Sequence, residues 1–324
     1  MAVASHTDAS PHVRANGQTV AFAASPAAQV LEPKPIDSKK DRDALRLFEL
    51  EQLEVSFDEA NSALWTFMRP PGRPSYNLAL LDDIHALQRG IVARFAGRPD
   101  ELRYLVAGSR THGVFSLGGD LDLFASLTRK KDREALAAYG KSCVRVLHRF
   151  FYALDLPIIG IGLAQGDALG GGFESLLSFN IIIAERNAKF GFSEALFGLF
   201  PGMGAYSLVA RRIGAAYAEE MMLSGKTYTA AEMHDAGLIH MVVEPGKGIE
   251  AAREYMQRNK RRHAGIRGVF AAGREVTPLS LDELDRIVNI WADTCMQLTE
   301  RDLKIMQRLV HAQDRLQGAM QAAE

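Results

Sequence analysis

Three consecutive glycines join a buried strand to an apolar helix near the middle of the chain. The segment LPIIGIGLAQG (156–166) has the apolar run of a buried strand, and GDALGGGFESLLSFN (166–180) follows it directly. Glycine stabilises a helix poorly, so a triplet at 170–172 indicates that close approach to the backbone is needed there. One carboxylate, Glu174, lies in the first turn of the helix that follows. We therefore expect this stretch to form half of an active site.

Strand and helix patterns alternate on both sides of this junction. The alternation is typical of α/β domains with parallel or mixed sheets. From about Ala215 onward the pattern is almost wholly helical, whereas residues 1–40 are rich in Ala, Ser and Pro and are expected to form a flexible tail. The expected elements before Ala215 include a strand–turn–strand at Leu53–Arg69, a helix at 78–95, a buried strand at 102–109, a loop entering a helix at 115–124, an amphipathic helix at 130–154, and a strand and turn at 180–192.

Composition excludes several classes of protein. The formal net charge of -1 argues against a general nucleic-acid binder, which needs a basic excess for phosphate contacts. Cys143 and Cys295 fit neither a metal-binding spacing nor a disulfide framework, so we expect a reducing cytoplasm and no metal. No run approaches the roughly 20 apolar residues of a membrane span, and MAVASHTDAS lacks the pattern of a signal peptide.

Two glycine-containing loops lead into helices, at FSLGGDL (115–121) and LGGGFE (169–174). A helix N-terminus offers unpaired N–H donors and a partial positive charge, and glycine lets a substrate approach them closely. Two such N–H groups aimed at one point would bind a carbonyl oxygen, and would bind it more tightly as it became an enolate. Losing one such donor typically costs about 3 kcal/mol of transition-state stabilisation.

Two carboxylates, Glu174 and Glu194, lie in apolar sequence surroundings. Phe173 precedes the first, and the second follows Phe190 and Phe192 in KFGFSEALFG. Apolar surroundings disfavour the ionised form, so we expect both pKa values to be raised toward the range useful for proton transfer. Two such acids can divide the work, one removing a proton while the other donates one.

These features together resemble the crotonase (enoyl-CoA hydratase/isomerase) superfamily. Its members carry, in order, an (F/S)-x-x-G-x-D loop, a G-x-A-x-G-G-G-x-E segment, an F-x-x-P/S-E segment and a P-G-x-G helix start. This chain matches with FSLGGD, GDALGGGFE, FGFSE and PGMG, and the resemblance covers roughly residues 50–245. It implies an α/β fold with a crotonase-like ββα spiral core and a helical C-terminal region. It also implies that no cofactor is needed, because a thioester substrate supplies the acidity.

The resemblance assigns roles to individual residues. Gly171 would give one oxyanion N–H, and Leu117 the other, or Gly118 if the register differs by one. Glu174 and Glu194 match the two acids of the hydratases, and which of them acts as base stays open. Keeping both acids favours hydration or dehydration over isomerisation or dehalogenation.

Within the superfamily the chain is most similar to the diffusible-signal-factor synthases, which make cis-2-unsaturated fatty-acid signals. The similarity lies in GGDLDLF, GDALGGGFESLLSFNIIIAE and FGFSEALFGLFPGMGAYSLVARR. It implies dehydration of a 3-hydroxyacyl thioester on acyl carrier protein, or on coenzyme A, followed by thioester hydrolysis. It also implies a homo-oligomer, a trimer or hexamer, and the receiver domain of a sensor kinase as a further partner. The alternatives are a generic 2-enoyl-CoA hydratase and a regulatory binding protein on the same scaffold.

The resemblance divides the chain into the tail at 1–40, a catalytic core at 41–245 and a helical region at 246–324. The last region is expected to cover an acyl pocket, to form an oligomer interface, or both. A small basic patch, NKRR at 259–262, is usually solvated surface, although an acidic carrier protein could dock there. The residues expected to bind substrate beside the acids and the oxyanion donors are Gly170, Gly172, Met203, Trp291 and Leu309.

Overall fold

Successive strands of the chain enter two different sheets. The structure is a computed structural model, and it describes residues 50–321. The larger sheet has the order β1-β2-β3-β5-β7-β10 and the smaller one the order β4-β6-β8-β9. The strands are β1 (Leu53–Asp58), β2 (Ala63–Met68), β3 (Tyr104–Ser109), β4 (Val114–Ser116), β5 (Ile159–Ala164), β6 (Asp167–Leu169), β7 (Ile181–Glu185), β8 (Lys189–Gly191), β9 (Thr227–Thr229) and β10 (Met241–Val243).

The two sheets are built by repetition of one unit. The pairs β3/β4, β5/β6 and β7/β8 each place one strand in the large sheet and the next in the small sheet, and helical segments follow. Pairing is parallel within each sheet, apart from β1 with β2 and β8 with β9. The predicted α/β fold with a ββα spiral core is therefore confirmed, as is the predicted strand–turn–strand at the start.

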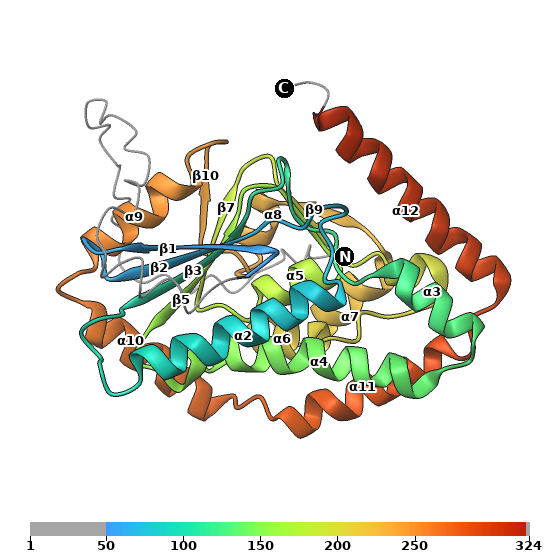
Figure 1. Cartoon of the computed structure of the whole chain (residues 1–324), viewed down its shortest axis with the longest axis horizontal. Coiled ribbons are helices and arrows are strands. Elements are labelled where there is room, and N and C mark those ends of the chain that lie inside the picture. The colour runs from blue at the N-terminus through green and yellow to red at the C-terminus, as the bar shows by residue number, and fades with distance from the viewer. Residues whose placement is uncertain (1–49, 322–324) are drawn as a thin grey trace, which may run out of the picture. The chain divides into compact units, whose positions relative to one another are not determined.

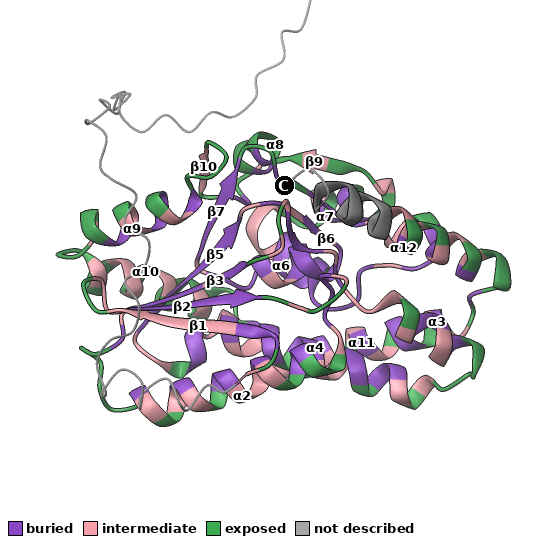
Figure 2. Ribbon diagram, turned by 45° about the horizontal axis from the view of Figure 1, so that its top comes forward, coloured by how far each residue is buried: buried purple, intermediate pink, exposed green. Residues whose placement is uncertain are grey.

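The large sheet is buried on both faces because its strands are apolar at successive positions. In β7, Ile181 and Ile183 belong to one core cluster and Ile182 and Ala184 to the other, as the two-residue period of a strand requires. One cluster lies against α2 (Leu78–Phe95) and α4 (Arg133–Phe151), and the other against α9 (Gly248–Arg258). Figure 2 shows this as purple along the inner strands β2, β3, β5 and β7, whereas the edge strand β1 is largely pink.

The C-terminal helices are divided between the two ends of the large sheet. Figure 1 shows α9 and α10 at one end of the large sheet, and α3 and α12 beyond its other end. The predicted helix at 78–95 is confirmed at both ends, with Asn77 accepting the Leu80 amide as the N-cap. The remaining helices are α3 (Leu121–Arg129), α5 (Gly171–Leu176), α6 (Ala205–Ile213), α7 (Ala215–Ser224), α8 (Ala230–Asp235), α10 (His263–Val276), α11 (Leu281–Cys295) and α12 (Glu300–Gln321), with 3₁₀ turns η2 (Ala153–Asp155) and η3 (Glu194–Phe197).

The short strands depart from the expectation. Beyond Ala215 the chain is not wholly helical, because β9 and β10 each add an edge strand to a sheet. A segment of three residues is too short for its hydrophobic periodicity to predict a strand, so these strands form because a neighbouring strand is there to pair with them. The described residues belong to one compact unit, and the predicted tail at 1–40 lies outside them. None of the helices described in 50–321 is long and apolar enough to cross a membrane.

Candidate active site

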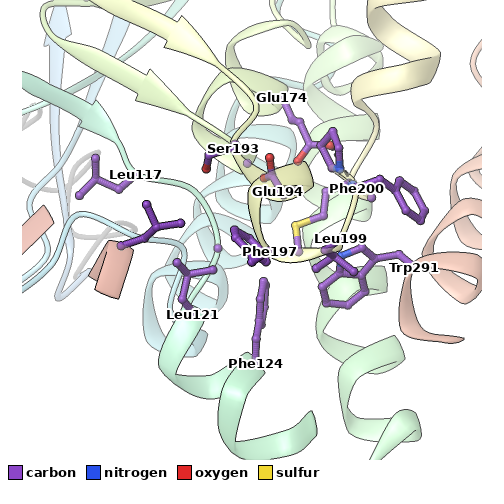
Figure 3. A pocket seen from close by; sticks show the side chains of 17 residues that line it. Leu117, Leu121, Phe124, Glu174, Ser193, Glu194, Phe197, Leu199, Phe200 and Trp291 are labelled. Carbon is purple, nitrogen blue, oxygen red and sulfur yellow. Dashed lines mark hydrogen bonds between the residues drawn. The ribbon is translucent and has the colours of Figure 1, made fainter. Parts of the chain in front are cut away.

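A pocket opens where the loops that follow β4, β6 and β8 meet α11 and α12. It encloses about 500 Å³, its opening included. Figure 3 shows the side chains of Glu174 and Glu194 next to each other, with Phe124, Phe197 and Trp291 on the apolar side. The lining consists of Leu117, Gly119, Leu121, Phe124, Gly170, Gly171, Glu174, Ser193, Glu194, Phe197, Leu199, Phe200, Pro201, Gly202, Met203, Trp291 and Leu309.

Glu174 is held by the start of a neighbouring helix. It lies in the first turn of α5, is 2% exposed, and its Oε1 accepts the amides of Met203 at 2.8 Å and Ala205 at 2.9 Å. Ala205 is the first residue of α6, whose N-terminus carries a partial positive charge. No described residue donates to Oε2, so this oxygen remains available to a reacting group.

Glu194 begins the 3₁₀ turn η3 and lies against the backbone of the glycine triplet. Its Oε1 is 2.5 Å from the point where a Cβ on Gly170 would be. Its Oε2 is buried and has no hydrogen-bond partner among the described residues. Gly170 has φ +51°, a conformation that L side chains rarely adopt, so glycine is required there on two grounds. The carboxylate thus occupies the space that a side chain on Gly170 would fill.

Burial raises the pKa of both carboxyl groups, as the apolar sequence surroundings predicted. The pKa of Glu174 rises to about 8 because burial disfavours the ion and the charge of Glu194 adds to the effect, although the amides of Met203 and Ala205 oppose it. Burial raises the pKa of Glu194 to about 7, against the opposing effect of its own amide and that of Ser193. Near neutral pH the pair therefore includes one group ready to accept a proton and one ready to donate it.

The first backbone donor differs from the one expected. The amide of Leu117 donates to the carbonyl of Pro74 at 2.8 Å, and that of Gly118 to Ser116 Oγ at 3.2 Å. Both predicted donors are therefore used inside the fold. The next amide, that of Gly119, has no acceptor among the described residues, and Gly119 lines the pocket. This corrects the predicted donor from Leu117 or Gly118 to Gly119.

The second predicted donor is the amide of Gly171, which has no acceptor among the described residues. The carbonyl of Gly170 accepts the amides of Phe173 and Glu174 at 2.9 and 3.1 Å. A trans peptide directs its N–H opposite to its C=O, so the Gly171 N–H points away from the helix. The two donors are neighbours, because the Gly119 nitrogen is 3.3 Å from the Cβ position of Gly171. The site thus presents two adjacent N–H groups beside two acids.

The apolar wall includes all three of the predicted chain-contacting residues. Met203, Trp291 and Leu309 line the pocket from the turn before α6, from α11 and from α12. Trp291 also packs directly on the backbone of Gly202, where an added Cβ would overlap the indole Cγ. Since Met203 follows Gly202 and donates to Glu174, the indole both lines the pocket and supports the turn that holds the acid.

One predicted substrate contact, Gly172, and one predicted oxyanion donor, Gly118, belong to the scaffold. Gly172 does not line the pocket, because it packs on β4, where an added Cβ would overlap the Ser116 carbonyl oxygen. Gly118, with φ +92°, lies behind the Gly171 nitrogen. The basic patch at 259–262 joins α9 to α10, at the opposite end of the large sheet from the pocket (Figure 1).

Sequence reasoning missed Gly119 and the aromatic residues of α3 and η3. The signal for Gly119 was present as the second glycine of FSLGGD, but only the hydrogen bonds of the preceding loop distinguish it from its neighbours. Phe124 and Phe197 lie in ordinary helical positions, and a pattern cannot separate a pocket wall from a core. Within residues 50–321, no group of three or more His, Cys, Asp or Glu side chains is placed to hold a metal ion.

Comparison with known proteins gives one consistent result. The sequence model of the enoyl-CoA hydratase/isomerase family matches residues 86–276, more than half of the chain. A probable enoyl-CoA hydratase of Rhizobium meliloti is 40% identical over 189 residues, which are 58% of this chain and 68% of that protein. The chain spans about half the length of some other curated relatives that it matches.

Solved structures agree with this result at the level of the fold. An enoyl-CoA hydratase from Bacillus halodurans superposes with a TM-score of 0.66 at 20% identity, covering 80% of this chain and all of that one. Pseudomonas aeruginosa DspI superposes with a TM-score of 0.60 at 24% identity, covering 75% of this chain and 97% of that one. The arrangement of two sheets and their covering helices is thus shared with proteins of very different sequence.

Proposed function

Because this chain belongs to the enoyl-CoA hydratase/isomerase family, we propose that it adds or removes water across C2 and C3 of an acyl thioester. One observation carries the proposal: two buried acids with raised pKa values lie on the same pocket as two backbone amides that have no acceptor among the described residues. Hydration chemistry needs both acids, since one moves the proton at C2 and the other protonates or activates the oxygen at C3. The apolar wall suits a fatty acyl chain.

In the dehydration direction the thioester carbonyl oxygen accepts from the N–H groups of Gly119 and Gly171. Glu194, the more acidic of the pair, removes the proton at C2, and the negative charge moves onto the carbonyl oxygen. Glu174 then donates its proton to the departing hydroxyl at C3, which leaves as water while the C2–C3 double bond forms. The two amides bind the enolate more tightly than the thioester, and this difference lowers the barrier.

The finer proposal is the synthesis of a cis-2-unsaturated fatty-acid signal from a 3-hydroxyacyl thioester on acyl carrier protein. Its support is the resemblance of the glycine and glutamate segments to the diffusible-signal-factor synthases. The second step is hydrolysis, in which a water activated by a glutamate adds to the carbonyl, the same amides bind the oxyanion, and the carrier thiol leaves. The proposal includes a cytoplasmic trimer or hexamer, and a sensor-kinase receiver domain as partner.

One assay distinguishes the candidate functions. The purified protein is given the same 3-hydroxyacyl chain on acyl carrier protein and on coenzyme A, and enoyl thioester and free acid are both quantified by mass spectrometry. We expect dehydration and release of free cis-2-unsaturated acid, more rapidly from the carrier protein. The names of the curated relatives favour the second candidate, a generic hydratase, which would interconvert the coenzyme A thioesters without releasing acid. A regulatory binding protein would convert neither substrate.

The pH dependence of the reaction follows from the two carboxyl groups. Below pH about 7 Glu194 gains a proton and no base remains, and above pH about 8 Glu174 loses its proton and no acid remains. We expect kcat/KM for dehydration to follow a narrow bell with apparent pKa values near 7 and 8, which belong to the pair as a unit. Circular dichroism over the same range shows whether the protein stays folded. A rate that is flat from pH 6 to 9 would contradict the acid–base assignment.

A further inference from the structure

Tyr139 carries a buried hydroxyl directly behind the first oxyanion donor. The residue lies on α4, is 3% exposed, and does not line the pocket. Its hydroxyl donates to the carbonyl of Tyr76 at 2.5 Å and accepts the amide of Asp120 at 3.2 Å. Burial raises the pKa of Tyr139 well above its usual value of 10, so the hydroxyl stays protonated at every pH at which the protein works.

The peptide groups on both sides of Gly119 are fixed by hydrogen bonds, one from the Tyr76 amide and one to the Tyr139 hydroxyl. On one side, the amide of Tyr76 donates to the carbonyl of Gly118 at 2.8 Å, which directs the N–H of the same peptide group, that of Gly119, the opposite way. On the other side, the Asp120 amide is held by Tyr139 itself. The tyrosine hydroxyl thus connects the segment that orients the Gly119 N–H to the peptide group that follows it.

Aromatic packing leaves the Gly119 segment little freedom to shift when this bridge is intact. An added Cβ on Gly119 would lie 2.5 Å from Cζ of Phe124, so the ring contacts the backbone directly. Phe124 packs edge-on against Tyr139, with ring centroids 5.2 Å apart, and against Trp291 at 5.0 Å. Packing therefore sets the position of the Gly119 segment, and the Tyr139 hydroxyl orients the peptide group that follows Gly119.

We infer that Tyr139 is a positioning residue for the oxyanion site, holding the Gly119 N–H toward the substrate carbonyl by bridging the Tyr76 carbonyl and the Asp120 amide. The inference rests on the proposed function and deepens it. Removing the hydroxyl leaves the Tyr76 carbonyl and the partly buried Asp120 amide without the group that bridges them, so the peptide group of Asp120 is free to rotate. Rotation at Asp120 turns Gly119, whose N–H then binds the developing oxyanion less well.

The test compares Tyr139→Phe with a matched control, Tyr152→Phe. Tyr152 caps the other end of α4, and its hydroxyl also bridges one carbonyl and one amide, those of Leu279, at 3.2 Å each. Both variants lose a hydroxyl that donates one bond and accepts one, but the bonds of Tyr152 go to Leu279, which neither lines the pocket nor adjoins Gly119. We expect Tyr139→Phe to lower kcat roughly tenfold to a hundredfold with KM nearly unchanged, less than the loss of an entire donor. Tyr152→Phe should keep the wild-type kcat.

A spectroscopic readout separates positioning from stability. The probe is a saturated acyl-coenzyme A analogue in which CH₂ replaces the thioester sulfur, labelled with ¹³C at the carbonyl, so that it is neither dehydrated nor hydrolysed. Binding to the wild type should move the carbonyl ¹³C resonance downfield because the two amides polarise it. Tyr139→Phe should lose part of that downfield movement and Tyr152→Phe none, whatever happens to their melting temperatures.

The outcomes distinguish this inference from the function on which it depends. Wild-type kcat and an unchanged carbonyl resonance in Tyr139→Phe would overturn the positioning role alone, even if the variant melts at a lower temperature. A wild-type protein that leaves the resonance at its free value would overturn the two-amide site, and the inference with it. A loss of kcat without any change of the resonance would assign Tyr139 to general stability instead.

Discussion

Replacing Glu174 with Gln is expected to lower kcat for dehydration by roughly 10³-fold, within the range usual for loss of a general acid. Glutamine has nearly the same shape, and its side-chain oxygen can still accept the amides of Met203 and Ala205 that Glu174 Oε1 accepts. The protein should therefore fold as before while losing the proton that leaves with the C3 hydroxyl. Single-turnover mass spectrometry with a 3-hydroxyacyl thioester measures the loss.

The same variant has a signature in stability. The pKa of Glu174 is raised from an ordinary value near 4.5 to about 8, so between these values the unfolded chain releases a proton that the folded protein keeps. The free energy of unfolding of the wild type therefore falls as pH rises from about 4.5 to 8, by at most about 1.4 kcal/mol for each pH step of one. Glutamine does not ionise, so the free energy of unfolding of Glu174→Gln does not fall in this way. The free energy of unfolding of the variant, relative to that of the wild type, should therefore increase by a few kcal/mol between pH 5 and 8.5.

Urea denaturation at the two pH values measures that difference. If the free energies of unfolding of the wild type and the variant differ by the same amount at pH 5 and at pH 8.5, Glu174 is not held protonated and is not the acid. Glu194→Gln should lower kcat by a similar factor, since it removes the base instead. Wild-type turnover in both variants would end the proposed mechanism.

Replacing Gly170 with Ala should lower the activity, because the added methyl group displaces the Glu194 carboxylate. The new Cβ would lie 2.5 Å from Glu194 Oε1, so the carboxylate must move by about 1 Å to reach ordinary van der Waals distance. A displacement of this size at a reacting group can cost about 10²-fold in rate. We therefore expect kcat to fall by roughly that factor, although every catalytic side chain is still present.

Gly246→Ala is the matched control for this substitution. Gly170 and Gly246 both have positive φ, +51° and +78°, so alanine strains the backbone at each position. Nothing lies within 4 Å of a Cβ on Gly246, however. Both variants should lose stability, and only Gly170→Ala should lose activity. Equal rates in the two variants would show that the contact with Glu194 does not set the position of the base.

The long elements and the order of the motifs were predictable. The helix at Leu78–Phe95 has enough turns for its period to be read, and Asn77 marks its start. The expected roles of Glu174 and Glu194 as pocket carboxylates followed from their apolar neighbours in the sequence and from the family resemblance. Their elements, α5 and η3, do bring both to one pocket. Local sequence carried this information because the apolar residues that mark each acid lie beside it in the chain, although the amides that hold Glu174 come from the start of α6.

The donor at Gly119 was not predictable in the same way. Leu117, Gly118 and Gly119 are adjacent, and the sequence contains no feature that says which amide stays unpaired. The choice is made by Pro74, whose carbonyl accepts the Leu117 amide from more than 40 residues away, and by Ser116, whose hydroxyl accepts the Gly118 amide. The short strands beyond Ala215 have the same origin, because three residues become a strand only when a partner strand is present.

By itself, then, the sequence determined an α/β chain with two glycine-bordered helix starts and two acids in apolar surroundings, since these depend on residue type and short spacing. The tertiary structure alone decided which amide is free, which oxygen of each acid is available, and that Trp291 supports Glu174 through Gly202. The physical reason is that an amide N–H donates to one acceptor and a space holds one side chain. Once a distant segment accepts that N–H or fills that space, no substrate atom can do so.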